Sequence, residues 1–447
     1  MRPDLVFKAY DIRGRTDNGD LDPELCELVG SALVDLLGAD RIAVGRDVRT
    51  SSGPLFEGLA RGITTAGADV IDLGEVPTDA IYYFSGSRGV PGAMITASHN
   101  PPVYNGIKLC RAGAAPIGVD TGLADIQARV QAGERKVAAT PGRIERVDAV
   151  SGYVDHLFSI VDPSEIRPLR VAVDGGNGMA GVALEKVFER IPARLTGLYL
   201  EPDGTFPNHP ADPLVPENLA DLEKLMGEGE FDLGVAFDGD ADRAFFLDDT
   251  GRPLSGSTVT SLLARRLLAG RPGEKVVHNL ITSKAVPEIV RECGGEPVRT
   301  RVGHSFIKAV MAETNAIFGG EHSAHYYFRD NYRADSGMLA MLHLMAILSA
   351  REEPLSVIRT EVERYAASGE INFEVSDPQE AIRKVEEAMA GEAAIDRLDG
   401  LTVDFGAEWF NLRPSNTEPL LRLNVEAPDP ERVEALVERV RSILEGA

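Results

Sequence analysis

Three carboxylates lie two residues apart in the segment DGDADR, residues 238–243. Apolar runs at 233–237 and 244–247 flank the segment and predict a strand on each side. Alternate residues of an extended chain point the same way, so the three side chains are expected to converge. Carboxylates this close repel one another unless a cation lies between them, and hard oxygen ligands suit Mg²⁺. We therefore predict one magnesium ion held by Asp238, Asp240 and Asp242.

Other interpretations of this segment were weighed against its residues. An EF-hand loop would need Gly at Arg243, Glu at Asp249 and flanking helices, and the sequence has none of these. A haloacid-dehalogenase-like phosphatase would need Thr or Val at Asp242. A polar hairpin turn without a metal stays open as the alternative.

The segment TASHNP, residues 96–101, follows a small apolar strand predicted at 92–95 and contains Ser98. The setting is not GxSxG, and His99 is expected to be poorly placed to reach the hydroxyl of its own neighbour, so a hydrolase triad is not predicted. Taken alone, the hexapeptide is more typical of a turn than of a catalytic site. A phosphoserine beside Mg²⁺ would have its charge neutralised, and that pairing indicates phosphoryl transfer.

Two further segments carry polar groups suited to a sugar phosphate. RPSNTEP, residues 413–419, places Arg, Ser, Asn and Thr donors around a proline-fixed turn, which suits a phosphate, although a capped turn with a solvated arginine fits equally well. GGEHSAH, residues 319–325, offers an acid, two imidazoles and a hydroxyl for sugar hydroxyls. Its spacing is not HExxH and no cysteine is near, so a zinc site is not predicted.

Composition narrows the possible partners. The 447 residues carry a net charge of −24, which disfavours nucleic acid and membrane surfaces as partners. No apolar run reaches the length of a membrane-spanning helix, and the first residues have no secretory pattern. Three widely spaced cysteines, Cys26, Cys110 and Cys293, read as reduced thiols. We therefore expect a cytoplasmic protein that binds neither nucleic acid nor membrane.

The elements that must position these segments alternate between strand and helix over the first three-quarters of the chain, which predicts α/β domains. One helix is marked by Asp22 as N-cap, Pro23 at its first position and Gly38 at its end. Domain breaks are expected near 130–150, a solvated connection, near 249–253 and near 367–369. The remainder reads as four short strands and two helices, a separate α+β unit.

Six segments, in order along the chain, resemble those of the α-D-phosphohexomutase family, most closely its bacterial phosphomannomutase/phosphoglucomutase branch. They are FKAYDIRG (7–14), GRDVRTSS (45–52), TASHNPPVYNGIK (96–108), DGDADR (238–243), GGEHSAHYYFRD (319–330) and RPSNTEP (413–419). The resemblance implies three related α/β domains with mixed sheets and a C-terminal α+β domain of TATA-box-binding-protein-like topology, around a central cleft. The expected domains are 1–150 with the phosphoserine loop, 151–250 with the metal loop, 251–367 with the sugar loop and 368–447 with the phosphate loop.

The resemblance also implies roles for single residues. Ser98 would be the phosphoserine and, with the three aspartates, a metal ligand. Arg13 and Lys108 would serve proton transfer and transition-state charge, His325 would carry a proton, and Arg243 would orient the phosphate, with His99 a further active-site residue. The expected ligand-binding residues are Tyr10, Asn100, Lys284, Gly303 and His304, with Glu321 and Ser323 on the sugar hydroxyls and Arg413, Ser415, Asn416 and Thr417 on the phosphate that is not transferred.

The implied activity is that of a Mg²⁺-dependent phosphomannomutase, with glucose phosphates as a further substrate pair. Mannose 6-phosphate and mannose 1-phosphate would interconvert through a phosphoserine enzyme and a hexose 1,6-bisphosphate. Phosphoglucosamine mutase and a catalytically silent sugar-phosphate-binding protein stay open as alternatives, and the expected state is a monomer or a homodimer. Two residues depart from the family pattern, because Ala324 and Ala241 stand where glycine is usual.

Overall fold

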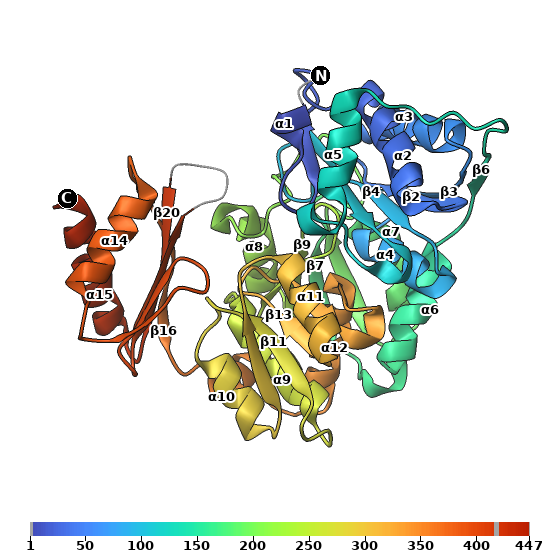
Figure 1. Ribbon diagram of the computed structural model, residues 1–447. Coiled ribbons are helices and arrows are strands. Elements are labelled where there is room, and N and C mark those ends of the chain that lie inside the picture. Colours follow the sequence, from blue (N-terminus) through green and yellow to red (C-terminus); the bar gives the residue numbers. More distant parts are fainter. Residues whose placement is uncertain (1–2, 415–419, 447) are drawn as a thin grey trace.

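The protein is described by a computed structural model that covers residues 3–414 and 420–446, with the side chain of His304 also outside the described part. Four sheets organise these residues, and Figure 1 shows the last of them, with its two helices, standing to one side of the other three. The α/β class predicted from the sequence is confirmed. Among the described residues, no helix is long and apolar enough to cross a membrane.

The first unit is a six-stranded sheet that carries the TASHNP loop at the end of a buried strand. The strand order is β1 (Ile12–Arg15), β5 (Tyr104–Cys110), β4 (Gly92–Ile95), β2 (Arg41–Arg46), β3 (Asp69–Glu75) and β6 (Ile144–Arg146). It is a mixed sheet, since β2 pairs in parallel with β3 and β4, whereas β4 and β5 are antiparallel. Its helices are α1 (Pro3–Val6), α2 (Pro23–Leu37), α3 (Ser52–Thr65), α4 (Thr78–Arg88) and α5 (Leu123–Ala132).

Helix α2 begins and ends as its sequence predicts. The Asp22 side chain accepts a hydrogen bond from the backbone N–H of Leu25, and Gly38 adopts the left-handed conformation with φ 58°. The predicted connection at 130–150 is largely exposed, but it also contributes the edge strand β6, which the sequence analysis missed. A three-residue strand is too short to show alternation.

The second unit places the DGDADR loop, residues 238–243, between two largely buried strands. Its strand order is β10 (Ala244–Leu247), β9 (Leu233–Phe237), β7 (Arg170–Asp174) and β8 (Arg194–Leu198), with helices α6 (Val150–Ile160), α7 (Ala180–Phe188) and α8 (Ala220–Glu228). Strands β9 and β10 are antiparallel neighbours, so the loop that joins them is a tight turn.

The third unit carries the GGEHSAH segment, residues 319–325, at the end of β13 and in the turn before β14. Its strand order is β12 (Glu296–Thr300), β11 (Lys275–Asn279), β13 (Phe318–Gly320), β14 (Tyr326–Phe328) and β15 (Ala334–Asp335). Its helices are α9 (Gly256–Leu268), α10 (Ala285–Glu292), α11 (His304–Thr314), α12 (Gly337–Ser349) and α13 (Leu355–Ile358). One continuous apolar core joins residues of the first three units.

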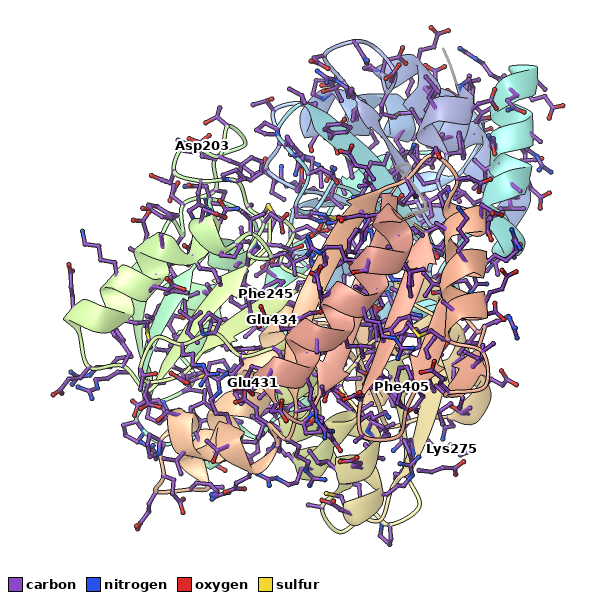
Figure 2. The ribbon with its side chains drawn as sticks, turned by 90° about the vertical axis from the view of Figure 1, so that its left-hand side faces the viewer. Asp203, Phe245, Lys275, Phe405, Glu431 and Glu434 are labelled. Carbon is purple, nitrogen blue, oxygen red and sulfur yellow. The ribbon has the colours of Figure 1, made fainter. Side chains whose placement is uncertain are left out.

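The fourth unit is an antiparallel sheet covered by two helices and has a core of its own. Its strand order is β16 (Ala366–Glu374), β20 (Leu420–Ala427), β19 (Trp409–Pro414), β18 (Leu401–Asp404) and β17 (Ala394–Asp396), with helices α14 (Pro378–Ala388) and α15 (Pro430–Glu445). The sequence analysis expected four strands; the fifth, β17, has only three residues and is too short to be recognised. Figure 2 shows Glu431 and Glu434 on α15, whose residues Val433 and Leu436 are buried.

The seam between the third and fourth units contains the only tryptophan of the chain. Trp409 is 5 % exposed and packs with Leu280 and Ile281 in a small apolar cluster. Its indole N–H donates to Glu426 at 2.9 Å. Nearby, the Lys284 ammonium donates to Asp404 at 2.6 Å. The domain boundaries expected from the sequence, at 150, 250 and 367, stay predictions.

A buried carboxylate ties the first three units together. Asp79, at the start of α4, accepts hydrogen bonds from the Tyr153 hydroxyl at 2.5 Å and the Ser336 hydroxyl at 2.6 Å, while its other oxygen has no partner among the described residues. Burial raises the pKa of Asp79 to about 7. The folded protein therefore binds this proton more tightly than the unfolded chain does.

We expect Asp79→Asn to stabilise the protein at pH 8 and to change little at pH 4. At pH 4 the wild-type carboxyl is protonated in the folded protein and about half protonated in the unfolded chain, so little of its stability contribution has yet been lost. That contribution is lost as the pH rises from there towards 7, where the folded protein must bury a charge. The amide keeps an acceptor and removes that charge, for a gain on the order of 3 kcal/mol at pH 8. Urea unfolding of both proteins across this range measures it, and a pH-independent difference contradicts it.

Candidate functional site

The TASHNP loop and the DGDADR loop meet in the folded protein. The Ser98 hydroxyl donates to Asp238 Oδ2 at 2.6 Å, across 140 residues of sequence. This approach requires glycine at 239, because a Cβ there would lie 2.5 Å from the carbonyl oxygen of Ser98. The residues that the sequence singled out as hydroxyl and metal ligands are therefore adjacent.

The reason that the sequence analysis gave for the convergence of the three aspartates is wrong. Residues 238–243 form a turn and not an extended segment, and Ala241 has a left-handed φ of 61°. The turn lets Asp238, Asp240 and Asp242 each place an oxygen within 4.8 Å of the others. Ser98 itself has φ 50°, a conformation that costs L-residues about 1–2 kcal/mol and clusters at functional sites.

The three aspartates fit a hard divalent cation. All are fully or almost fully buried, and Oδ1 of Asp240 and of Asp242 has no hydrogen-bond partner in the described part of the chain. Two cations face them: Lys108 Nζ lies 2.8 Å from Asp240 and 2.6 Å from Asp242, and Arg243 Nε lies 2.9 Å from Asp238. Two positive charges against three negative ones leave an excess negative charge and unused oxygen lone pairs.

Charge in this cluster is unevenly distributed. Burial raises the pKa of Asp238 to about 7, against the opposing effect of Arg243. Burial acts the same way on Asp240 and Asp242, but Lys108 lowers both pKa values below the usual range. Burial would lower the pKa of Lys108, yet the two carboxylates raise it well above its usual range. Lys108 is therefore a fixed positive charge.

Two of the other predicted catalytic residues, Arg243 and His99, lie next to the Ser98 hydroxyl. The Arg243 Nη2 lies 3.5 Å from Ser98 Oγ. His99 Nδ1 lies 3.3 Å from the same oxygen, so the expectation that this ring cannot reach its neighbour's hydroxyl is wrong. Burial and the nearby Arg243 lower the pKa of His99 to about 2, so the ring is neutral. Arg13 bridges the Asn100 side chain at 2.5 Å and Asp11 at 2.6 Å.

The GGEHSAH segment, residues 319–325, places a carboxylate that accepts three hydrogen bonds in the wall of a cavity. Glu321 is 2 % exposed and accepts from the Tyr327 hydroxyl at 2.5 Å, the Asn279 amide at 3.1 Å and the Gly303 N–H at 3.2 Å. The side chain of Ser323 lies 3.2 Å from His325 Nδ1. The neighbouring Ala324 adopts a left-handed φ of 64°, as a glycine would, so its replacement of glycine leaves the turn intact.

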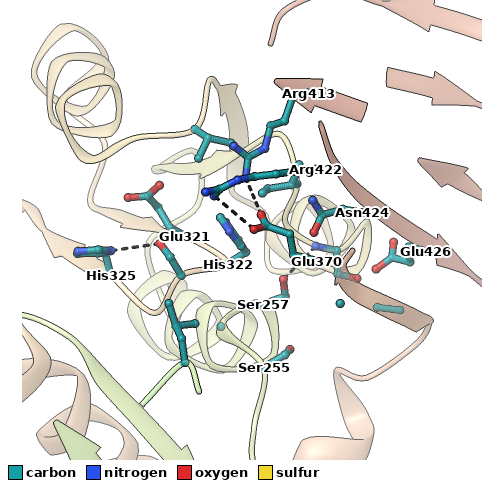
Figure 3. A pocket seen from close by; sticks show the side chains of 18 of the residues that line it. Ser255, Ser257, Glu321, His322, His325, Glu370, Arg413, Arg422, Asn424 and Glu426 are labelled. Carbon is teal, nitrogen blue, oxygen red and sulfur yellow. Dashed lines mark hydrogen bonds and ion pairs between the residues drawn. The ribbon is translucent and has the colours of Figure 1, made fainter. Parts of the chain in front are cut away.

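A cavity of about 1420 Å³ lies between the GGEHSAH segment and the fourth unit. Figure 3 shows Glu321 and His325 on one side and Arg413, Arg422 and Glu370 on the other. Ser323, Tyr10 and Gly303 also line the cavity. Arg413 is 7 % exposed and donates to Glu370 at 2.8 Å. The cavity therefore has an acidic, hydroxyl-rich end and a cationic end.

Comparison with known proteins agrees with this arrangement. Sequence models of phosphoglucomutase/phosphomannomutase domains I, II, III and the C-terminal domain match residues 4–136, 151–251, 255–365 and 370–443. This chain belongs to the phosphoglucomutase/phosphomannomutase family.

Relatives of this family member match it over nearly the whole chain. Proteins described as phosphohexose mutases from Xanthomonas campestris pv. campestris are 41 % identical over 99 % of both chains. The phosphomannomutase of Escherichia coli strain K12 is 40 % identical over 96 % of both chains. The crystal structure of a phosphoglucomutase/phosphomannomutase family protein from Burkholderia thailandensis has a TM-score of 0.89 at 31 % identity and covers 98 % of this chain and 97 % of its own.

Some predicted ligand-binding residues of this phosphoglucomutase/phosphomannomutase family member are not placed at the cavity. Lys284 is engaged with Asp404 and with the carbonyl oxygen of Gly406 at the seam with the fourth unit, so its predicted ligand contact stays a prediction. The predicted residues Ser415, Asn416 and Thr417 and the His304 side chain lie outside the described residues.

The sequence analysis missed several residues that shape the site. The Thr78 hydroxyl donates to Asp240 at 2.6 Å, and the Arg49 guanidinium fastens the Ser98 loop. Arg49 lies in the GRDVRTSS segment, whose resemblance to the family could have drawn attention to it. Lys308 and Asp335 form a buried ion pair at 2.7 Å beside His325, and Arg422 lies in the cavity wall. These last residues stand in ordinary helix and strand sequence, and only the fold brings them to the site.

Proposed function

We propose that this protein is a phosphomannomutase that interconverts mannose 6-phosphate and mannose 1-phosphate, with glucose phosphates as a second substrate pair. The observation that carries the proposal is the Ser98 hydroxyl, 2.6 Å from a buried triple carboxylate, in a protein whose relatives at about 40 % identity are phosphomannomutases. One cavity contains both the Glu321 carboxylate, which suits sugar hydroxyls, and the Arg413 and Arg422 guanidinium groups, which suit a phosphate. A sugar that carries a phosphate would match both.

The proposed resident ion is one Mg²⁺, held by Asp238, Asp240 and Asp242 with the phosphorylated Ser98 as the fourth ligand. When bound, it would neutralise negative charge on the phosphoryl group being transferred. The buried oxygens of Asp240 and Asp242 without partners support this assignment.

The protein's own residues would then guide the transfer. The bond between phosphorus and Ser98 Oγ breaks as a bond forms to a sugar hydroxyl, whose proton leaves to a neighbouring base, proposed to be His325. Ser98 Oγ keeps the electron pair of the broken bond and takes up a proton from solvent, which restores the hydroxyl that donates to Asp238. Lys108 and Arg243 hold positive charge beside the moving group, where it stabilises the transition state. Arg413 holds the second phosphate of the resulting 1,6-bisphosphate. After the bisphosphate has reoriented in the cavity, the phosphate at its other end is transferred to Ser98.

The decisive experiment is a substrate panel with a hexose 1,6-bisphosphate as activator. We expect turnover with mannose phosphates to give the highest kcat/KM among mannose, glucose and glucosamine phosphates. A preference for glucosamine phosphate would identify a phosphoglucosamine mutase, and no turnover of any of them would indicate a silent binding protein. Release of one inorganic phosphate for each substrate molecule consumed would indicate a phosphatase instead.

We also propose a cytoplasmic location, for which the three cysteines without disulfide partners give support. The proposed partners are small hexose phosphates, and the expected state is a monomer or a homodimer.

A further inference from the structure

An internal anion lies at the cationic end of the cavity. Arg413 on β19 and Arg422 on β20 are opposite each other in the antiparallel register. Both contact the carboxylate of Glu370 on β16, at 2.8 Å from Arg413 Nη2 and 3.3 Å from Arg422 Nη1 (Figure 3). Like charges directly opposite each other on a sheet are destabilising, so this carboxylate offsets the repulsion between the two guanidinium groups.

The carboxylate leaves donors of this wall unused. The Nε atoms of Arg413 and Arg422 and the Nδ2 atom of Asn424 are buried and have no hydrogen-bond partner among the described residues. Asn424 is directly opposite Glu370 in the pairing of β20 with β16, and all four residues line the cavity. A phosphate offers more acceptor oxygens than a carboxylate and therefore matches this set of donors better.

We propose that Glu370 is an internal competitor for the substrate's phosphate, whose carboxylate occupies the Arg413–Arg422 pair in the free protein and is displaced when phosphate binds. The phosphate in question is the one assigned to this end of the cavity under the proposed function. Glu370 weakens phosphate binding by its negative charge and by holding the guanidinium groups. In a reaction whose bisphosphate must leave this wall and turn, the returning carboxylate favours release.

A β-bulge directly precedes Glu370, and the strand after it is regularly paired. The pairing of β16 with β20 shifts register between Ala367 and Glu370, and Gly369 has a left-handed φ of 69°. The backbone N–H of Val425 donates to the Ser368 hydroxyl at 3.0 Å across this bulge. Residues 371–374 keep their regular pairing, so the Glu370 side chain can leave the arginines without unpairing the strand.

The test is Glu370→Gln, which keeps the size of the side chain and removes its charge. Calorimetric titration with inorganic phosphate and with mannose 1-phosphate should give Kd values about 5–10-fold lower than those of the wild type, with a lower kcat as release slows. Unchanged or weaker binding of both ligands would overturn the proposal, because it would show that Glu370 only positions the two arginines.

Two further variants sharpen the result. Glu408→Gln is the matched control, because Glu408 is also 29 % exposed, faces one arginine of the fourth unit at 3.7 Å and is not among the cavity-lining residues. It should leave both Kd values unchanged. Glu370→Asp keeps the charge but shortens its reach, so it should tighten phosphate binding less than Glu370→Gln does; weaker binding than wild type would again indicate a positioning role.

Binding of inorganic phosphate separates this inference from the proposed function. A protein with no mutase activity whose Glu370→Gln variant still binds phosphate more tightly would refute the function and keep the competitor. An active mutase in which the two proteins bind phosphate equally would keep the function and refute the competitor.

Discussion

Ser98→Ala is expected to abolish turnover of mannose 1-phosphate, with kcat lowered by ~10⁴-fold or more, because it removes the hydroxyl proposed to carry the phosphoryl group beside Asp238. Folding and ligand binding should survive. The Ser98 loop is held through its main-chain carbonyl groups, and alanine adopts the same backbone conformation with no added strain. Coupled assays of mutase activity and calorimetric titration with mannose 6-phosphate measure the two effects.

A second readout and a control belong to this prediction. Intact-mass analysis of purified wild type should reveal a fraction heavier by one phosphoryl group, which excess substrate removes and which the variant lacks. Ser85→Ala is the control, since Ser85 is a buried serine of the same unit that donates to Val90 O at 2.7 Å, outside the site. Full activity in Ser98→Ala would refute the phosphoserine mechanism.

Arg49→Lys is expected to lower the free energy of unfolding by about 3–5 kcal/mol, because it breaks up a buried charge network. The guanidinium donates to the carbonyl oxygens of Ser98 and Asn100 at 2.7 Å, of Pro101 at 2.8 Å and of Tyr104 at 3.0 Å. It also contacts Asp47 at 3.0 Å, and one ammonium cannot replace this planar set of donors.

The same substitution should lower kcat by about 10²-fold, because displacement of the loop by ~1 Å moves Ser98 away from the three aspartates. Arg46→Lys is the matched control, because Arg46 is the last residue of β2, three positions before Arg49. Its guanidinium forms an ion pair with Asp72 at 2.8 Å and lies over the Phe56 ring, away from the Ser98 loop. Urea unfolding and mutase assays should show much smaller effects there. Equal losses in both variants would contradict the clamp assigned to Arg49.

Much of the fold and the centre of the site could be predicted because their signals are local. Asp22 and Gly38 mark the ends of α2 in sequence, and the acids of DGDADR stand too close together to ignore. The convergence of these acids was predicted, but it depends on a turn in which Ala241 has a positive φ. Alanine rarely adopts that conformation, so the sequence did not indicate the turn.

What could not be predicted depends on partners that are distant in sequence. Thr78 reaches Asp240 across 162 residues, and Asp79 reaches Ser336 across 257. Neither residue carries a local signal, because a threonine and an aspartate at the start of a helix are ordinary capping residues. Lys284 is a further example, since its partner Asp404 lies 120 residues away in the fourth unit and its predicted ligand contact stays a prediction.

The position of Trp409 gives the protein a built-in optical probe. The chain has no other indole, and this one lies against Leu280 and Ile281 of the third unit while belonging to the fourth. Its emission therefore reports whether these two parts of the polypeptide are in contact, with no label attached. Solvent reaching the ring would shift that emission to longer wavelength, so a separation of the two parts on addition of substrate would be visible in real time by rapid mixing.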